Sequence, residues 1–276
     1  MSGTSTRQVA FTLIELLVVI TILGLLVAIT VPSLGRALEL SHRAACSMTL
    51  KTLGDAANMY ASEQGSAGYF PTFHDGDFGT KNVGLNRDDA DPSHTHGNTR
   101  GWYKLVRFDY CSIASFHCAS DELVSDRGQT EDDPIYDFQT YDDEAPISYS
   151  LQVTKITDGE GLPTLKSISR AKPIAADRNG LRKWEVLSQA RAYTERDESV
   201  EPSAGSEEDR QAMSSPNHDR EGTNVLRADT SVTWEADPFC GIERDNIWTW
   251  DDGTTLGEYE DENNPPAHDD DSYLMP

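Results

Sequence analysis

Cysteine and histidine are the residue types in this sequence best suited to metal binding or covalent cross-linking. Cys111, His117 and Cys118 lie close together in the chain, and thiolates with an imidazole are ligands that zinc prefers. No second ligand pair occurs at zinc spacing, so the sequence predicts no metal site here. The alternative is a local disulfide between Cys111 and Cys118, which have six residues between them. Closing so short a loop would stabilise the fold by about 2–3 kcal/mol.

The other candidate ligands are scattered along the chain. With Cys46 and Cys240 there are four cysteines, and four cysteines allow three full pairings. Cys46 is either a buried thiol or a partner of Cys240, because the sequence gives no distance between them. Asp251 and Asp252 are candidate ligands for calcium, which takes six to eight oxygen ligands, but the spacing of an EF-hand is absent. We expect no cofactor, with calcium as the one ion considered.

Catalysis has little support in the sequence. An exported hydrolase would have to use residues such as His218 and Asp229, but we expect His218 to hydrogen-bond a hairpin instead. There is no Gly-Lys-Ser/Thr phosphate loop, no Gly-x-Ser-x-Gly elbow and no His-Glu-x-x-His pair. The sequence therefore predicts a protein that is not an enzyme.

The chain is strongly acidic, and its apolar residues are concentrated near the N-terminus. The 276 residues include 47 acidic and 23 basic ones, for a net charge of −24. General nucleic-acid binding needs a basic surface, so nucleic acid is excluded as a partner. The apolar residues are concentrated in residues 11–31, where Glu15 is the one charged side chain.

Residues 11–31 have the length of a membrane-spanning helix. At about 1.5 Å per residue they form a helix roughly 31 Å long, close to the hydrocarbon thickness of about 30 Å. A cleaved secretory signal has a shorter apolar segment. An unpaired carboxylate inside a membrane costs about 2.5 kcal/mol or more, so we expect Glu15 to have a partner and a function.

The segment from Ala10 to Ile20, AFTLIELLVVI, resembles the type IV prepilin family. That family has a short polar leader, a small residue (usually Gly, here Ala10) and then FTLIELLVVI. The resemblance implies that a prepilin peptidase cleaves between Ala10 and Phe11 and that the new N-terminus is methylated. It also implies that Glu15 pairs with the amine of a neighbouring subunit during assembly. Pairing within the chain and a protonated Glu15 remain alternatives.

The orientation in the membrane also follows from the resemblance. Lysine and arginine counts near the span weakly favour the opposite topology, because only Arg7 precedes it while Arg36, Arg43 and Lys51 follow. Prepilin peptidases cut on the cytoplasmic face, so we expect the N-terminus in the cytoplasm. The chain would be a single-pass protein of the bacterial inner membrane with a periplasmic or extracytoplasmic head, or part of a cell-surface filament.

The remaining elements predict an α+β fold. Apolar residues recur at near-helical spacing over 32–63, namely Leu34, Leu38, Ala45, Leu53, Ala57 and Tyr60. Residues 147–153 and 173–177 are predicted strands, and 223–226 with 232–234 a hairpin. We expect a pilin-like fold, in which a long N-terminal helix packs on a mostly antiparallel sheet with long acidic loops.

The expected organisation has five parts: a leader (1–10), a transmembrane or filament-core half-helix (11–31), an amphipathic half-helix (32–63), a globular head (64–250) and an acidic tail (251–276). Segments 121–144 and 194–209 and the tail are typical of solvated loops. The last dozen residues are expected to be poorly ordered.

A second resemblance lies around His218. The segments SPNH and GTNVL, followed by Asp229, resemble the C-terminal motif of a large bacterial group of prepilin-processed proteins, a His, nine residues and Asp-Gly around an Asn-Val-Leu strand. Here ten residues separate His218 from Asp229, and Thr230 replaces the glycine. The implied motif residues are His218, Asn224 and Asp229.

These observations lead to one functional hypothesis and two alternatives. We expect a structural subunit of a type IV pilus or a type II secretion pseudopilus, minor rather than major, because 266 residues after cleavage is large for a major pilin. Its partners would be the prepilin peptidase, other pilin subunits through the N-terminal helix, and the inner membrane. The alternatives are a membrane-anchored display protein that does not polymerise and an exported hydrolase.

Overall fold

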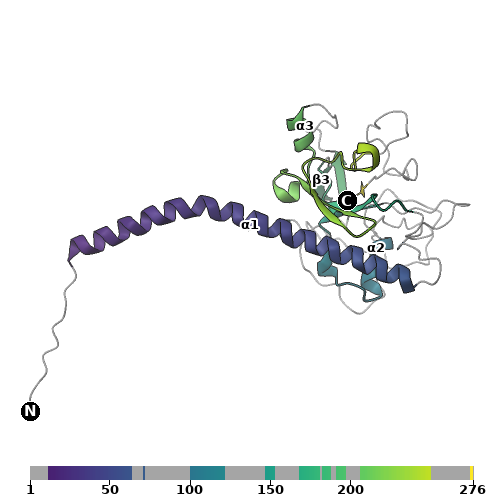
Figure 1. Ribbon diagram of the computed structural model, residues 1–276, viewed down its shortest axis with the longest axis horizontal. Coiled ribbons are helices and arrows are strands. Elements are labelled where there is room, and N and C mark those ends of the chain that lie inside the picture. Colours follow the sequence, from purple (N-terminus) through teal and green to yellow (C-terminus); the bar gives the residue numbers. More distant parts are fainter. Residues whose placement is uncertain are drawn as a thin grey trace, which may run out of the picture. The chain divides into compact units, whose positions relative to one another are not determined.

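The computed structural model describes residues 12–63, 71, 100–121, 147–152, 168–180, 182–187, 191–196, 206–249 and 274–275 (Figure 1). The chain divides into two compact units, Met1–Ser41 and His42–Pro276. Helix α1 (Leu13–Glu63) contributes its first part to one unit and its second part to the other. Helix α1 extends to Glu63, the last described residue before a gap, as far as the predicted helix does.

The second part of α1 is amphipathic and carries one buried face. Cys46, Leu50, Leu53 and Ala57 are at most 2% exposed and follow one another at intervals of three or four positions, which keeps them on one side of a helix. Leu53, Ala57 and Tyr60 are buried as predicted, whereas Leu34, Leu38 and Ala45 are exposed. The buried face therefore begins at Cys46.

The hydrophobic core forms between this face and the elements that follow. Helix α2 (Arg100–Arg107) and the short helix η1 (Ile113–Phe116) supply fully buried Trp102, Leu105 and Phe116. These side chains belong to the same core as Leu50 and Leu53 of α1. The sheet closes this core with Tyr149, Leu151, Ile174 and Leu226.

A five-stranded antiparallel sheet carries the rest of the head, in the order β6-β5-β2-β1-β7. Its strands are β1 (Tyr149–Gln152), β2 (Pro173–Asp177), β5 (Thr223–Arg227), β6 (Val232–Glu235) and β7 (Leu274–Met275). All residues of β2, the central strand, are buried. The predicted strands over 147–153 and 173–177 and the β5–β6 hairpin are confirmed, and so is the α+β fold class.

The end of the chain corrects one expectation. Leu274 and Met275, which lie within the last dozen residues, form edge strand β7 and pair with Gln152 and Leu151 of β1. Leu274 is fully buried, so an apolar side chain anchors an otherwise acidic segment.

The structure also adds elements within and beside the segment expected to be a solvated loop over 194–209. Strands β3 (Arg182–Leu187) and β4 (Arg191–Arg196) form a separate hairpin. Helix α3 (Glu207–Ala212) follows, and none of its residues is buried. It starts in a capping box between Ser206 and Asp209, which stabilises a helix start without apolar periodicity. For this reason α3 was missed.

Candidate functional site

The start of α1 holds Glu15, the one charge of the apolar segment. The Thr12 backbone N–H and hydroxyl donate to Glu15 Oε2 over 2.8 and 2.6 Å, and the Glu15 N–H donates to Thr12 Oγ1 over 3.3 Å. This reciprocal pair is a capping box, which fixes the helix start and satisfies two of its free N–H groups. The expected cleavage position at Ala10 and Phe11 lies outside the described residues.

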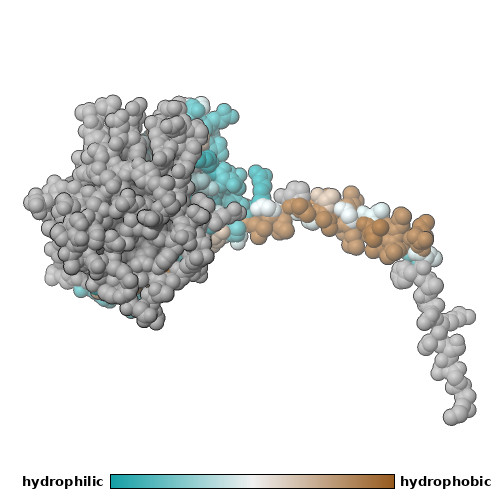
Figure 2. Space-filling view, turned by 180° about the vertical axis from the view of Figure 1, so that it is seen from behind, coloured by the Kyte–Doolittle hydropathy of each residue, from teal (hydrophilic) through white to brown (hydrophobic). Residues whose placement is uncertain are grey.

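The first unit presents an apolar surface along α1. Its described large apolar side chains are at least 46% exposed, and they are coloured brown in Figure 2; examples are Leu13, Leu17, Leu25, Ile29 and Val31. Exposed apolar surface of this extent marks a membrane or protein contact. By length and composition, α1 is able to cross a membrane.

The head contains a second candidate site, built around a disulfide between Cys46 and Cys118. The predicted local disulfide between Cys111 and Cys118 is wrong, because Cys118 pairs with α1 across 72 positions and Cys111 is a free thiol. The reason is helix periodicity, which places Cys46 on the buried face of α1 facing Cys118. Cys46 does not pair with Cys240, which is also free.

The two free thiols are held in their protonated forms. Burial raises the pKa of Cys111 to about 12. The pKa of Cys240 is also raised, first by burial and then by the charge of Glu235. Neither thiol has the lowered pKa that marks a reactive cysteine.

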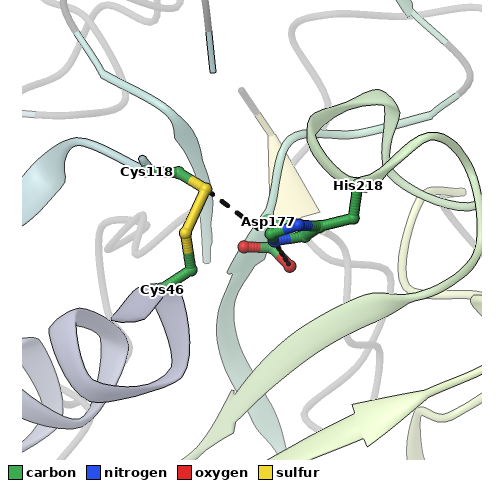
Figure 3. Close-up of side chains that lie close together, drawn as sticks. All are labelled: Cys46, Cys118, Asp177 and His218. Carbon is green, nitrogen blue, oxygen red and sulfur yellow. Dashed lines mark hydrogen bonds and ion pairs between the residues drawn. A yellow bond between two sulfur atoms is a disulfide. The ribbon is translucent and has the colours of Figure 1, made fainter. Parts of the chain in front are cut away.

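His218 lies beside the disulfide in a fully buried polar cluster (Figure 3). Its Nε2 is 3.7 Å from Cys118 Sγ and 3.3 Å from Asp177 Oδ2. Asn224 donates to the same carboxylate oxygen twice, from its backbone N–H over 2.6 Å and from Nδ2 over 3.0 Å. Asp177 Oδ1 is buried and has no hydrogen-bond partner among the residues that the structure describes.

Two neighbouring strands and a short helix position the residues of the cluster. Asp177 ends the central strand β2, and Asn224 is the second residue of the neighbouring strand β5. His218 ends the short helix η2 (Pro216–His218), which begins with a Ser215 cap and is followed by Asp219 at a φ of 54°. Asn217 fixes this turn by donating from Nδ2 to the Ser148 carbonyl over 2.9 Å.

Trp234 packs against the histidine, and Arg43 packs on Trp234. The His218 and Trp234 rings meet edge to face with centroids 5.5 Å apart. The Arg43 guanidinium lies 4.2 Å from the Trp234 ring centroid and pairs with Glu221. Gly222 makes this packing feasible, because a Cβ there would lie 2.5 Å from the Trp234 ring.

Tyr149 and Arg178 are ionisable groups near the cluster, and the pKa of each is shifted. The pKa of Tyr149 is raised, mainly by burial and then by the negative charge of Asp177. Arg178, next to Asp177, is buried and paired with Asp121. Burial lowers the pKa of Arg178, and the Asp121 charge opposes that shift.

The predicted motif residues separate in space. His218 and Asn224 meet at the cluster, whereas Asp229 lies exposed in the β5–β6 turn, where its Oδ1 accepts from the N–H and hydroxyl of Ser231. These two hydrogen bonds lower the pKa of Asp229. The carboxylate beside His218 is Asp177, which the sequence analysis missed. Its position at the end of a predicted strand was the available signal.

The calcium candidates Asp251 and Asp252 lie outside the described residues.

Comparison with known proteins identifies the N-terminal segment. A family model described as the prokaryotic N-terminal methylation motif matches residues 6–31. The match supports a type IV pilin-like or pseudopilin-like subunit, and it indicates a structural protein rather than an enzyme. No curated protein matches the chain, and no solved structure does.

Proposed function

We propose that this protein is a minor structural subunit of a type IV pilus or a type II secretion pseudopilus. A prepilin peptidase would cleave it between Ala10 and Phe11 and methylate the new N-terminus. The match over residues 6–31, together with Glu15 in an exposed apolar helix, is the observation that carries this proposal.

The helix start explains how Glu15 would act in assembly. Cleavage places the new amine at Phe11, next to Thr12, which holds the carboxylate in the capping box. A carboxylate costs about 2.5–3.5 kcal/mol at the centre of a membrane, and the amine of a neighbouring subunit would offset that cost. An incoming subunit would therefore find the carboxylate already oriented at the start of the helix.

The apolar surface of α1 would serve two successive environments. In the precursor it would contact lipid, with the N-terminus in the cytoplasm and the head in the periplasm. After cleavage the same side chains would pack against other subunits in the filament core. Leu34, Leu38 and Ala45, exposed in the single chain, would be part of that contact.

Within the prepilin-processed proteins, we propose that the chain belongs to the group that carries the C-terminal motif of His, nine residues and Asp-Gly. Support comes from His218 and Asn224, which lie together at the buried cluster. Asp229 would have a separate task, because its hydrogen bonds to Ser231 stabilise the β5–β6 turn.

Cross-linking in the native membrane tests the proposal. The unaltered chain should give a ladder of self-adducts, and Glu15→Gln should remove the ladder while the chain remains in the membrane. Glu39→Gln, a carboxylate change further along the same helix, is the matched control and should keep the ladder. A single adduct with a foreign protein, unaffected by Glu15→Gln, would instead support a display protein that does not polymerise.

A further inference from the structure

The buried cluster in the head contains four side chains that are ligands of transition metals. Cys46 comes from α1, Cys118 follows η1, Asp177 ends β2 and His218 ends η2. One ligand atom from each lies within 4.8 Å of the others, and all four residues are buried (Figure 3). Four segments that are distant in sequence therefore converge on one point.

We propose that this cluster is a metal site controlled by the redox state of the Cys46–Cys118 pair. When the pair is reduced, the two thiolates, His218 Nε2 and an Asp177 carboxylate oxygen bind one zinc ion in tetrahedral geometry. When the pair is oxidised, the disulfide replaces the ion. The two states exclude each other because they use the same sulfur atoms.

The distances agree with the edges of a zinc tetrahedron. Zinc lies about 2.3 Å from sulfur and about 2.0–2.1 Å from nitrogen or oxygen. Neighbouring ligands in a regular tetrahedron are then roughly 3.3–3.8 Å apart. The observed separations are 3.3 Å from His218 Nε2 to Asp177 Oδ2 and 3.7 Å from that nitrogen to Cys118 Sγ. The two sulfur atoms must separate from bonding distance to contact distance, and the four ligand atoms already lie within 4.8 Å of one another.

Asp177 provides a second, independent observation. Its Oδ2 is held by two donors of Asn224, while its Oδ1 is buried with no hydrogen-bond partner in the described part of the chain. A buried carboxylate oxygen without a donor is costly, and a cation bound by the Asp177 carboxylate would offset that cost. Asn224 then acts as the outer hydrogen-bond partner that orients a metal-binding carboxylate.

The ligand types select the metal. Two thiolates and one imidazole are soft or borderline ligands that favour zinc over calcium and magnesium, which prefer oxygen. Four protein ligands in a closed, buried site are typical of structural rather than catalytic zinc. Both states would connect α1 to the segment that follows η1, and the zinc ion would add β2 and η2 to that connection, so the exchange would alter the cross-link and keep the fold.

The chemistry of the exchange balances with an external reductant. A phosphine or dithiol supplies two electrons, the sulfur–sulfur bond breaks, and two protons give the thiols of Cys46 and Cys118. Zinc then displaces both thiol protons and binds the thiolates. The reverse step needs a two-electron oxidant, such as a protein disulfide of the cell envelope, and releases the ion.

Zinc titration of the full-length chain in detergent tests the proposal. After reduction with a phosphine, the chain should retain one equivalent of zinc through gel filtration, and the oxidised chain should retain none at this site. The double variant Cys111→Ser/Cys240→Ser is the matched thiol control and should bind zinc as the unaltered chain does. Asn224→Ala should weaken binding about 10–100-fold, and His218→Ala should weaken it further.

Two spectroscopic measurements keep the proposal falsifiable if a variant does not fold. Cobalt added to the reduced, unaltered chain should give thiolate charge-transfer bands and tetrahedral d–d bands. X-ray absorption spectroscopy at the zinc edge should find two sulfur ligands at about 2.3 Å and two nitrogen or oxygen ligands near 2.0 Å. No retained zinc in a folded, reduced chain, or a shell without sulfur, would overturn the proposal.

Discussion

The Cys46–Cys118 disulfide supports a quantitative prediction about the head, which Cys118→Ala tests. The bond links positions 72 residues apart. In the chain-entropy relation a loop of that length stabilises the folded state by about 4 kcal/mol. The local Cys111–Cys118 disulfide expected from sequence would have contributed about 2–3 kcal/mol. The observed disulfide therefore differs from the expected one in the partner of Cys118 and in the stabilisation it provides.

Urea unfolding followed by tryptophan fluorescence, with a metal chelator present, measures this effect. Trp102 and Trp248 are fully buried and report on the core. Cys118→Ala should lower the free energy of unfolding by about 4 kcal/mol. With an m-value near 3 kcal/mol/M, the urea midpoint should fall by more than about 1 M. The matched control Cys111→Ala removes a thiol outside the bond and should cost much less.

A reductant distinguishes the stability contributed by the disulfide bond from the stability contributed by packing of the Cys118 side chain. Dithiothreitol should reproduce most of the loss in the unaltered chain and in Cys111→Ala, and should leave Cys118→Ala unchanged. The reasoning is refuted if Cys111→Ala becomes insensitive to reductant, because Cys118 would then pair with Cys111. An unaltered chain whose midpoint ignores the reductant would refute it as well.

Three further predictions concern the cluster, a buried thiol and processing. Asn224→Ala removes the Nδ2 donor of a buried carboxylate and keeps the backbone N–H donor, so it should cost about 1.5–3 kcal/mol, whereas Asp229→Ala in an exposed turn should cost under about 1 kcal/mol; urea midpoints compare the two, and equal losses would contradict the separate placement. Because the pKa of Cys111 is raised from 9.0 to about 12, its thiolate fraction at pH 8 is roughly 1,000-fold below that of an ordinary thiol. Alkylation of Cys111 should therefore be slow in the folded chain and fast in urea, and the folded rate should rise with pH up to about 12; equal rates at pH 8 would refute the burial effect. Ala10→Gly restores the family's usual residue and should be cleaved at least as completely as the unaltered chain, while Ala10→Leu should accumulate as precursor on an immunoblot; full cleavage of Ala10→Leu would be inconsistent with the proposed site.

Local patterns in the sequence were sufficient for much of the fold. The helix through Glu63, the strand Pro173–Asp177 and the hairpin around Asp229 were predicted from periodicity and turn residues. Helix α3 could not be predicted this way, because it has no buried face and depends on the Ser206–Asp209 capping box.

The candidate sites differ in how far they were predictable. The N-terminal site is contiguous, so Glu15 and its neighbours were identified from sequence. The buried cluster joins residues from α1, η1, β2 and η2, and its geometry depends on packing between distant segments. His218 and Asn224 were identified through their motif, but the partner of Cys118 and the role of Asp177 required the structure.

The N-terminus of the mature chain tests the central claim most directly. The full-length protein would be expressed with and without its prepilin peptidase, and the N-terminal peptide would be identified by mass spectrometry. With the peptidase, the chain should begin at Phe11 and carry a methyl group on its amine; without it, the chain should retain the leader. A chain that still begins at Met1 when the active peptidase is present would contradict the claim.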